Sequence, residues 1–473
     1  MTDPTGPTLT DAKGMGGIIA QDGFDYQVWD ALVRLPAWLR STAFEGLTLE
    51  GLEDLEARFF APHAPHGHLL DRFQAKSGIL TRSQLAEVFS GFVKFNEVHQ
   101  GVARSHVLVT PGLPKELQWI ARDPERVRRA RPFYAPFTGV MEASDEKLQN
   151  DLAAEFGAEL GPPVAQSFDV SLRVIPDHAT AVALFTAALE EAFPGSEFSS
   201  RKATEAFRML ADHLNRERGR MVDRSTMLRL LAESLGVPLV IEGALAVHVR
   251  SDRNTACDDA VEIDASPFSG TEGPPPTSDE WQSSLLVPLD RTARWAHSTG
   301  RSRVRITGSY RISTAIALGW AFRSATGFEL EIATRDGDWL TDDRPTAAES
   351  GISWQISPAE HLHQGRLVIT IGVLRNPAQD VRGALGLSSE DHLLSAFLPH
   401  PIKNGREAQW AAHSIKNAVV AATASLMPEG IDLYYAGPAA LAVAIGHRWN
   451  AMRRTQLHEL RPGLGYVRSA TIQ

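Results

Sequence analysis

The sequence predicts an α/β protein with more than one domain. Its 473 residues exceed what a single hydrophobic core holds, and chains of this length divide into domains. From residue 303 onward, short apolar runs alternate with helix-like segments, which is typical of parallel strands joined by helices. Residues 18–110 follow another order: helix, strand, strand, helix, strand. We therefore expect two α/β domains, residues 1–235 and residues 236–473.

The composition is that of an ordinary soluble globular protein, with 43% hydrophobic and 22% charged residues. Because the net charge is −10, binding of nucleic acid would need a local basic surface. The single cysteine, Cys257, excludes an internal disulfide and multi-cysteine zinc sites, and we expect it to be a packed side chain. The sequence contains neither a signal peptide nor an apolar run long enough to span a membrane, so we expect a cytoplasmic protein without membrane contact.

The first domain opens with a stretch rich in Pro, Thr and Gly, residues 1–15, which we expect to be a loose tail. A helix is predicted over residues 18–39, because apolar residues recur there at helical spacing: Phe24, Val28, Leu32 and Leu35. Two strand-like runs, a helix and a buried strand follow, at residues 52–60, 69–78, 82–100 and 105–110. Residues 141–235 are mostly helical, and the sequence leaves open whether they belong to this domain or connect it to the next.

Residues 69–78, LLDRFQAKSG, carry polar side chains where a buried strand would be apolar. Side chains two apart share one face of a strand, so Gln74 and Lys76 lie together, and a hairpin with the preceding strand brings Asp54 beside them. This combination suits phosphodiester hydrolysis, because oxygen ligands hold a hard Mg²⁺ and an ammonium stabilises charge on phosphorus. The same spacing also occurs on the solvated face of an edge strand.

These residues resemble the centre of the PD-(D/E)xK nuclease superfamily, in which an Asp and an (Asp/Glu)-x-Lys motif meet across a hairpin. The match here is Asp54 with Gln74-x-Lys76, preceded by a helix that carries Gln27. The resemblance implies a restriction-endonuclease-like domain, a Mg²⁺ or Mn²⁺ ion held by Asp54 and Gln74, and double-stranded DNA as the substrate.

Gln74 departs from the superfamily pattern, because a neutral amide stands where an acid is usual. Glu50 or Glu53 is therefore expected to complete the metal shell, and the sequence does not decide between them. The predicted catalytic set consists of Asp54, Gln74, Lys76, Glu53 and Gln27.

Two further features of this domain have ordinary explanations as well as functional ones. His63, His66 and His68 lie in a Pro- and Gly-rich turn, where we expect a surface loop and no metal site. Seven Lys or Arg stand against three acids between residues 104 and 131, a local charge of +4. This run suits either duplex phosphates or a solvated helix face paired with neighbouring acids.

The second domain follows a Pro-, Gly- and Ser-rich connector, residues 266–281. Strand-to-helix junctions occur at RVRITGSYRIS and IDLYYAGPAALA, and ligands of α/β sheets bind at such junctions, where helix amides meet phosphate. A long helix is predicted at residues 404–427, a strand at 430–437 and a helix at 438–456. Taken singly, each junction is equally well a plain capped helix.

Residues 240–473 resemble the SAVED domain, a fusion of two CARF-like (CRISPR-associated Rossmann-like) halves. The segments that carry the resemblance are DDAVEIDASPFSG, SDEWQSSLLVPL, RVRITGSYRISTAIALGWAFRSATGFELEI and GIDLYYAGPAALAVAIGHRWNAMRRTQLHEL. The resemblance implies binding of a cyclic oligonucleotide, a cyclic trinucleotide rich in adenine. The predicted contacts are Ser309, Tyr310, Arg311, Ser313, Arg335, Arg375, Asn376, Lys403, Gly437 and Pro438, with Trp320, Tyr310 or Trp410 as candidates for stacking on bases.

Together, the two resemblances imply a nuclease–SAVED effector of cyclic-oligonucleotide-based antiphage signalling (CBASS). Its second messenger would come from a CD-NTase-type nucleotidyltransferase and would drive homo-oligomerisation and cleavage of double-stranded DNA. Two alternatives remain from the sequence. One is a restriction-type endonuclease that acts without a nucleotide, and the other is a catalytically degenerate DNA-binding module under nucleotide control.

Overall fold

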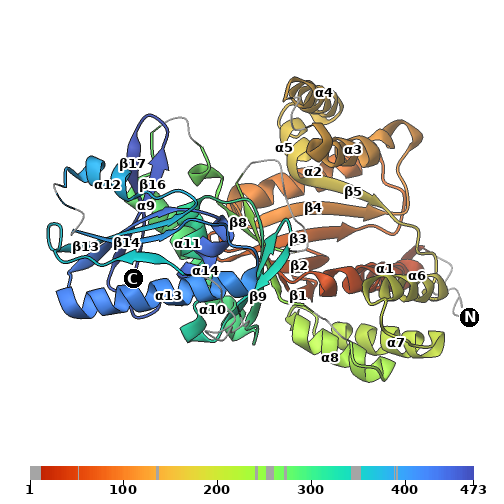
Figure 1. Ribbon diagram of the computed structural model, residues 1–473. Coiled ribbons are helices and arrows are strands. Elements are labelled where there is room, and N and C mark those ends of the chain that lie inside the picture. Colours follow the sequence, from red (N-terminus) through yellow and green to blue (C-terminus); the bar gives the residue numbers. More distant parts are fainter. Residues whose placement is uncertain are drawn as a thin grey trace, which may run out of the picture. The chain divides into compact units, whose positions relative to one another are not determined.

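The computed structural model describes residues 12–51, 53–134, 138–239, 243–251, 260–270, 274–341, 353–387, 389 and 392–473. For residues 12–22, 128–134, 138 and 166 only the backbone is described, and Cys257 lies outside the described residues. The chain forms two compact units, Met1–Glu242 and Gly243–Gln473 (Figure 1). No helix within these ranges combines the length and the hydropathy that a membrane span requires.

The first unit is a mixed six-stranded sheet with helices on both faces (Figure 1). The strand order is β5-β4-β3-β2-β1-β6, with β5 (Phe168–Leu172), β4 (Ala103–Thr110), β3 (His68–Ala75), β2 (Leu55–Phe60), β1 (Phe44–Leu49) and β6 (Met221–Asp223). The helices are α1 (Ala12–Arg40), α2 (Arg82–Val98), α3 (Trp119–Tyr134), α4 (Thr138–Phe156), α5 (Gly161–Ser167), α6 (His178–Ala192), α7 (Ser200–Arg216) and α8 (Arg224–Leu235), with a 3₁₀ turn η1 (Lys115–Leu117).

Helix α1 confirms the predicted apolar face, because Val28, Leu32 and Leu35 are buried. It starts at Ala12, so residues 12–15 are helical and the prediction of a loose tail is wrong for them; residues 1–11 lie outside the described part of the chain. Strand β1 was not predicted as a separate element. The run near residue 50 is a turn that divides two strands, because Glu50 adopts a left-handed backbone with φ of 52°.

The helical segment after residue 141 is part of the first unit. Helix α6 packs on α1, and β6 adds an antiparallel strand to β1 through Leu47 opposite Val222. Helix α8 then ends at Leu235, where Gly236 closes it with φ of 71°.

The second unit contains two sheets. The first has the order β11-β10-β9-β7-β8, with β11 (Gly337–Leu340), β10 (Glu329–Thr334), β9 (Arg303–Gly308), β7 (Leu245–Arg250) and β8 (Val261–Asp264). The second has the order β12-β14-β13-β15-β16-β17, with β12 (Gln355–Ser357), β14 (Leu393–Leu398), β13 (Arg366–Val373), β15 (Gly430–Ala436), β16 (Thr455–Arg461) and β17 (Gly465–Ile472).

The predicted parallel pairing is confirmed in both sheets. Strands β8, β7, β9 and β10 run parallel, as do β14, β13, β15 and β16, and antiparallel strands form the edges β11, β12 and β17. The helices are α9 (Ser278–Trp281), α10 (Val287–Ser298), α11 (Ile312–Ala321), α12 (Ala378–Leu385), α13 (Gly405–Leu426) and α14 (Ala439–Arg448), with short turns η2 (Ser266–Phe268), η3 (Gln282–Leu286) and η4 (Ser324–Thr326). The helix predicted for residues 438–456 is shorter than expected, because β16 already begins at Thr455.

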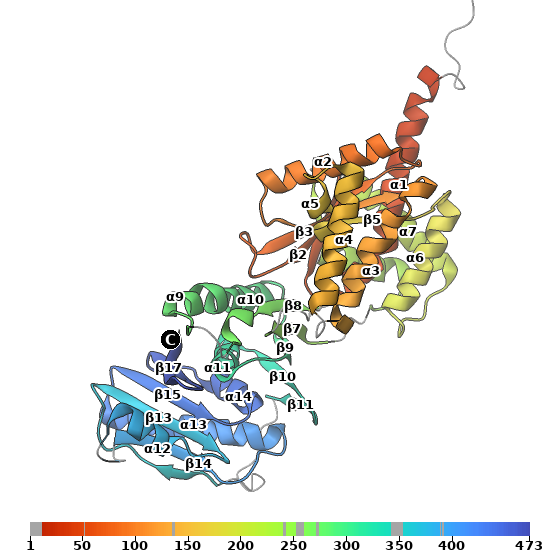
Figure 2. The ribbon, with the colours of Figure 1, turned by 90° about the horizontal axis from the view of Figure 1, so that it is seen from above.

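The two sheets of the second unit are joined by helices α11 and α14, which lie side by side between them (Figure 2). The helices can approach so closely because each carries a glycine, without a side chain, opposite a backbone carbonyl of the other helix. A Cβ on Gly319 would lie 2.0 Å from the Val443 carbonyl oxygen, and one on Gly446 would lie 2.1 Å from the Ile316 carbonyl oxygen. This reciprocal contact positions one Rossmann-like half against the other.

Replacing Gly319 with Ala is expected to destabilise the second unit by about 1–3 kcal/mol, because neither backbone can move away from the added methyl group without unpacking. The control is Gly383→Ala in α12, where a Cβ meets nothing within 4 Å and the better helix propensity of Ala gives up to about 1 kcal/mol of stabilisation. Urea unfolding of the full chain measures both. Equal midpoints for Gly319→Ala and the parent chain would contradict this account of the contact.

Candidate functional sites

The predicted nuclease residues meet at the end of the β2–β3 hairpin. The register pairs Leu55 with Phe73, so its continuation places Asp54 opposite Gln74 on the same face of the sheet. The Asp54 carboxylate accepts a hydrogen bond from the Ala75 amide at 2.8 Å. Lys76 follows directly, and its backbone amide bonds the Val109 carbonyl of β4 at 2.8 Å. The hairpin therefore brings Asp54, Gln74 and Lys76 together, as the spacing predicted.

The electrostatics of Asp54 are those of a partly desolvated carboxylate. Burial raises its pKa, and the negative charge of Glu50 acts in the same direction. The hydrogen bond from the Ala75 amide and the positive charge of Lys76 lower the pKa. Burial is the largest effect, so the pKa of Asp54 is raised overall. Lys76 is thus close enough to act on the charge of Asp54.

Glu53 has a different partner, the buried guanidinium of Arg72. Arg72 is 1% exposed, and its Nη2 donates to Glu53 Oε1 at 2.8 Å. The guanidinium also lies 3.4 Å from the centre of the Phe95 ring and 3.4 Å from His106 Nδ1. Because removing one partner of a buried ion pair costs about 3–5 kcal/mol, Glu53 is committed to Arg72.

His106 completes the support of Arg72 as a neutral ring. Burial and the positive charge of Arg72 lower its pKa to about 3. Arg72 can only donate, so Nδ1 of His106 accepts and Nε2 carries the proton that it donates to Asn96 Oδ1, at 2.8 Å. Neither Arg72 nor His106 was predicted from the sequence, because the sequence pattern of a strand does not reveal whether a polar side chain is buried.

The donor set at Asp54 fits a magnesium ion. Asp54 and Gln74 supply a carboxylate and an amide oxygen, which are hard ligands, and Mg²⁺ is commonly held by one or two carboxylates together with water and substrate phosphates. Within the described ranges, no three His, Cys, Asp or Glu side chains gather closely enough to hold a metal ion by themselves. Glu50 lies across from Asp54, since its amide bonds the Asp54 carbonyl at 2.9 Å, and its carboxylate is 3.5 Å from Arg218.

Two other predicted features of this unit lie elsewhere. Gln27 is on α1, which packs on the opposite, Phe73-bearing face of the sheet through Trp38 and Arg34, and its catalytic role stays a prediction. In the basic run, Arg104 is paired with Asp71 and Arg122 with Asp123. The side chains of Arg128, Arg129 and Arg131 are outside the described part of the chain.

In the second unit, the predicted phosphate site at the β9–α11 junction is already occupied by internal contacts. Gly308 has φ of 99° and lies against the Val249 carbonyl, which accepts from the Ser309 amide at 3.1 Å. Arg311 Nε donates to the Ser269 carbonyl at 2.9 Å, and the hydroxyls of Ser313 and Ser469 are 2.7 Å apart. Tyr310 is half-buried, and burial raises its pKa to about 12.

An acid that the sequence analysis missed lies at this junction. Burial raises the pKa of Glu459 on β16, while Arg311, the Ser313 amide and Arg461 lower it. Glu459 is far from Ser313 in the sequence, and only the pairing of the two halves brings them together.

The other predicted ligand residues lie at strand ends in both sheets. Arg335 follows β10 and is exposed, and Lys403 is exposed after β14. Arg375 pairs with Asp380 at 2.7 Å, and Asn376 accepts from the Ala378 amide, so both are engaged at the start of α12. Gly437 and Pro438 join β15 to α14, with Pro438 as its N-cap. Trp320 lies beneath the Arg323 guanidinium at 4.6 Å, and Trp410 is half-buried on α13.

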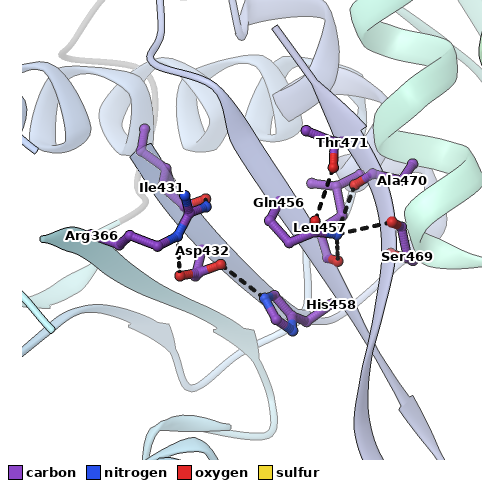
Figure 3. Close-up of polar contacts among 9 residues, drawn as sticks. All are labelled: Arg366, Ile431, Asp432, Gln456, Leu457, His458, Ser469, Ala470 and Thr471. Atoms are coloured by element: carbon purple, nitrogen blue, oxygen red, sulfur yellow. Dashed lines mark hydrogen bonds and ion pairs between the residues drawn. The ribbon is translucent and has the colours of Figure 1, made fainter. Parts of the chain in front are cut away.

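A polar cluster on the second sheet was also not predicted (Figure 3). Asp432 accepts from Arg366 Nε at 2.6 Å and lies 3.0 Å from His458 Nε2. The His458 ring stacks on Tyr434, with centroids 4.2 Å apart. Burial alone would raise the pKa of Asp432, but the hydrogen bonds from His458 and Arg366 outweigh it and hold the pKa below its ordinary value.

Beside this cluster, Gln456 fills an irregularity in the β16–β17 ladder (Figure 3). Its amide nitrogen donates to the carbonyls of Leu457, Ser469 and Ala470, and its oxygen accepts from Thr471. The extra residue in β17 turns the Ser469 hydroxyl toward Ser313 of α11.

The comparisons with known proteins agree with this architecture. Residues 288–472 match the family model described as SAVED, the SMODS-associated and fused to various effectors sensor domain. Two relatives called CD-NTase-associated protein 4 align over 96% of both chains: 22% identity over 463 residues for the protein of Moraxella osloensis and 23% over 467 residues for that of Acinetobacter sp. (strain ATCC 27244 / 9458).

Solved structures match nearly the whole chain. The Cap4 SAVED/CARF-domain containing receptor of Moraxella osloensis has a TM-score of 0.74 at 20% identity, covering 96% of this chain and 100% of that one. The Acinetobacter baumannii Cap4 receptor with the cyclic trinucleotide 2'3'3'-cAAA has a TM-score of 0.76 at 19% identity, covering 95% and 98%. The same receptor with 3'3'3'-cAAA has a TM-score of 0.74. The predicted fold class, including the two CARF-like halves, is confirmed.

The Asp432 cluster makes a prediction about pH. A carboxyl whose folded pKa lies below its ordinary value of 3.8 stabilises the fold fully above that pH, and this contribution is lost as the pH falls through the folded pKa. Asp432→Asn should therefore cost about 1–3 kcal/mol at pH 7, and the difference from the parent should shrink below pH 4. Urea unfolding at several pH values measures this, with the exposed Glu360→Gln as the control. A difference that is constant with pH would contradict the ion-pair account.

Proposed function

We propose, starting from the SAVED domain that this chain carries at residues 288–472, that the protein is an effector of CBASS antiphage defence. Its second unit binds a cyclic trinucleotide, and its first unit then cuts double-stranded DNA. The observation that carries the proposal is the match along nearly the whole chain to Cap4 receptors, one of which was solved with cyclic trinucleotides.

The residues that support binding of a cyclic trinucleotide lie at the ends of the parallel strands of the second unit. In open α/β sheets ligands bind beyond the carboxyl ends of the strands, and here Arg335 and Lys403 stand exposed at such ends. Exposed cations suit the phosphates of a cyclic oligonucleotide, and Lys403 also stands just before the start of α13. The half-buried Tyr310 at the β9–α11 junction offers an aromatic face for a base.

The nuclease proposal draws its support from the convergence at the β2–β3 hairpin. Asp54 and Gln74 would hold Mg²⁺ or Mn²⁺, which supplies Lewis-acid activation of the phosphodiester and of a water molecule when bound. Lys76 places an ammonium beside this position, where it orients the scissile phosphate and stabilises negative charge that develops on it. Arg72 and Glu53 hold the strand beneath the site.

The coupling between the two activities follows from differential binding. A cyclic trinucleotide activates the nuclease only if it binds the assembled, active form more tightly than the idle one. We propose that the active form is a homo-oligomer and that a CD-NTase-type nucleotidyltransferase supplies the nucleotide.

Two observations favour a second candidate function. Gln74 is neutral where an acid is usual, and the described residues contain no group of three His, Cys, Asp or Glu side chains that could hold a metal ion. In this alternative the first unit binds DNA under nucleotide control without cutting it. A nuclease that needs no nucleotide is the third outcome to be distinguished.

Plasmid cleavage separates these functions. The full chain is incubated with supercoiled plasmid and Mg²⁺, alone or with 2'3'3'-cAAA, 3'3'3'-cAAA or cyclic dinucleotides. We expect cleavage only with a cyclic trinucleotide. Cleavage without any nucleotide would support the restriction-type enzyme, and nucleotide-dependent DNA binding without cleavage would support the degenerate module.

Replacement of Lys76 tests the catalytic assignment. Lys76→Ala should reduce the cleavage rate by about 10²–10³-fold, because an interaction aimed at developing charge is lost, while DNA binding is kept. The matched control is Lys94→Ala, an exposed lysine on α2 of the same unit, which should cleave at the parent rate. Cleavage by Lys76→Ala at the parent rate would remove Lys76 from the site.

A further inference from the structure

Helix α11 begins without a capping side chain. Its N-cap is Arg311, which makes no capping hydrogen bond, and the first turn contains no acidic residue. The first amides of a helix need acceptors and carry the positive end of the helix dipole. A residue from a distant strand lies at this helix start: it is Glu459 on β16, and the Ser313 amide of the first turn lowers the pKa of its carboxyl group.

Glu459 is 7% exposed, so the residue is more than nine-tenths buried. Its Oε1 atom has no hydrogen-bond partner among the residues that the structure describes. A buried carboxylate oxygen without a donor is unfavourable, because the hydration lost on burial is not replaced. The Glu459 carboxylate is therefore itself satisfied only in part.

Two arginines act on the same carboxylate. Arg461 follows Glu459 by two residues on β16, so the two side chains share the buried face of that strand. The positive charges of Arg461 and Arg311 both lower the pKa of Glu459. Each guanidinium also holds the segment before α9: Arg311 Nε donates to the Ser269 carbonyl at 2.9 Å, and Arg461 Nη2 donates to the Gly270 carbonyl at 2.6 Å. Arg461 is 3% exposed, so this positive charge is buried and its position is fixed.

We propose that the N-terminus of α11, with Arg311 and Arg461, is an anion seat that Glu459 fills in the ligand-free chain and that accepts a phosphate group in its place. Two cations and one carboxylate leave a surplus of one positive charge. A phosphodiester carries the same single charge as the carboxylate and offers two non-bridging oxygens, so the exchange would leave neither arginine unpaired. Only the source of the phosphate, a cyclic oligonucleotide, rests on the proposed function.

The opposing explanation is that Glu459 is a permanent bridge between the two halves. The two explanations differ in what happens when the carboxylate loses its charge. A bridge that loses its charge only weakens the fold. In a seat, the neutral side chain no longer balances the two arginines, so the affinity for an anion from solution rises.

The first experiment uses inorganic phosphate as the probe. Thermal unfolding of the full chain is followed with increasing phosphate at constant ionic strength, with chloride as the balancing anion. Phosphate should raise the Tm of Glu459→Gln by about 3 °C or more beyond its effect on the parent chain, because a ligand that binds only the folded state stabilises it. The control is Glu429→Gln, an exposed acid of the same unit, which should respond like the parent. A response of Glu459→Gln equal to that of the parent overturns the seat.

Glu459→Asp is measured in the same titration and decides the question if Glu459→Gln does not fold. The shorter side chain keeps the charge but withdraws the carboxylate from the Ser313 amide, so phosphate should again stabilise this variant more than the parent. Equal responses of Glu459→Asp and the parent also overturn the seat.

The second experiment identifies the source of the phosphate. Binding of 2'3'3'-cAAA and 3'3'3'-cAAA to the parent and to the folded Glu459 variant is measured by calorimetry. The variant should bind about tenfold more tightly, because the internal competitor is gone. Equal nucleotide affinities together with no phosphate response overturn this inference and leave the proposed function standing. Phosphate stabilisation without nucleotide binding by either chain supports the seat and contradicts the proposed function.

Discussion

The close contact between α11 and α14 is the constraint on which the second unit depends. Two glycines, Gly319 and Gly446, each face a carbonyl of the opposite helix at a distance that no side chain tolerates. Each helix begins at the carboxyl end of a parallel strand, α11 after β9 and α14 after β15. The contact therefore sets the distance between the strand ends of the two sheets. It also brings Ser313 to Ser469 and to Glu459, so that the start of α11 is built from both halves.

The first unit depends on register in a comparable way. Side chains alternate between the two faces of a strand, so a slip of one residue between β2 and β3 would move Gln74 and Lys76 to the side of α1. Buried pairs prevent such a slip: Trp38 packs on Phe73 on one face, and Glu53 pairs with Arg72 on the other. The polar candidate site is thus held by apolar and ionic contacts that take no part in its chemistry.

The sequence predicted what short-range patterns control. Helical spacing predicted α1, alternating apolar runs predicted the parallel strands, and the two-residue spacing of Gln74 and Lys76 placed them beside Asp54. It did not predict β1, because Glu50 turns the chain through a left-handed residue that the composition of the segment does not reveal. Nor did it predict the roles of Arg72 and Glu459, because their partners are chosen by sheet register and helix packing over long separations.

Buried arginines determine which acids can change partner in the two units. Arg72 is enclosed by the carboxylates of Glu53 and Glu56, the Phe95 ring and the neutral ring of His106, so both of its anionic partners come from its own sheet region. Arg311 and Arg461 differ, because they hold backbone carbonyls as well as facing Glu459. In the proposed exchange of Glu459 for a phosphate, these backbone contacts would hold both guanidinium groups in place. A cation that is fixed by its backbone contacts therefore keeps its position when its anion changes, whereas a buried cation without such contacts depends on its acid partner.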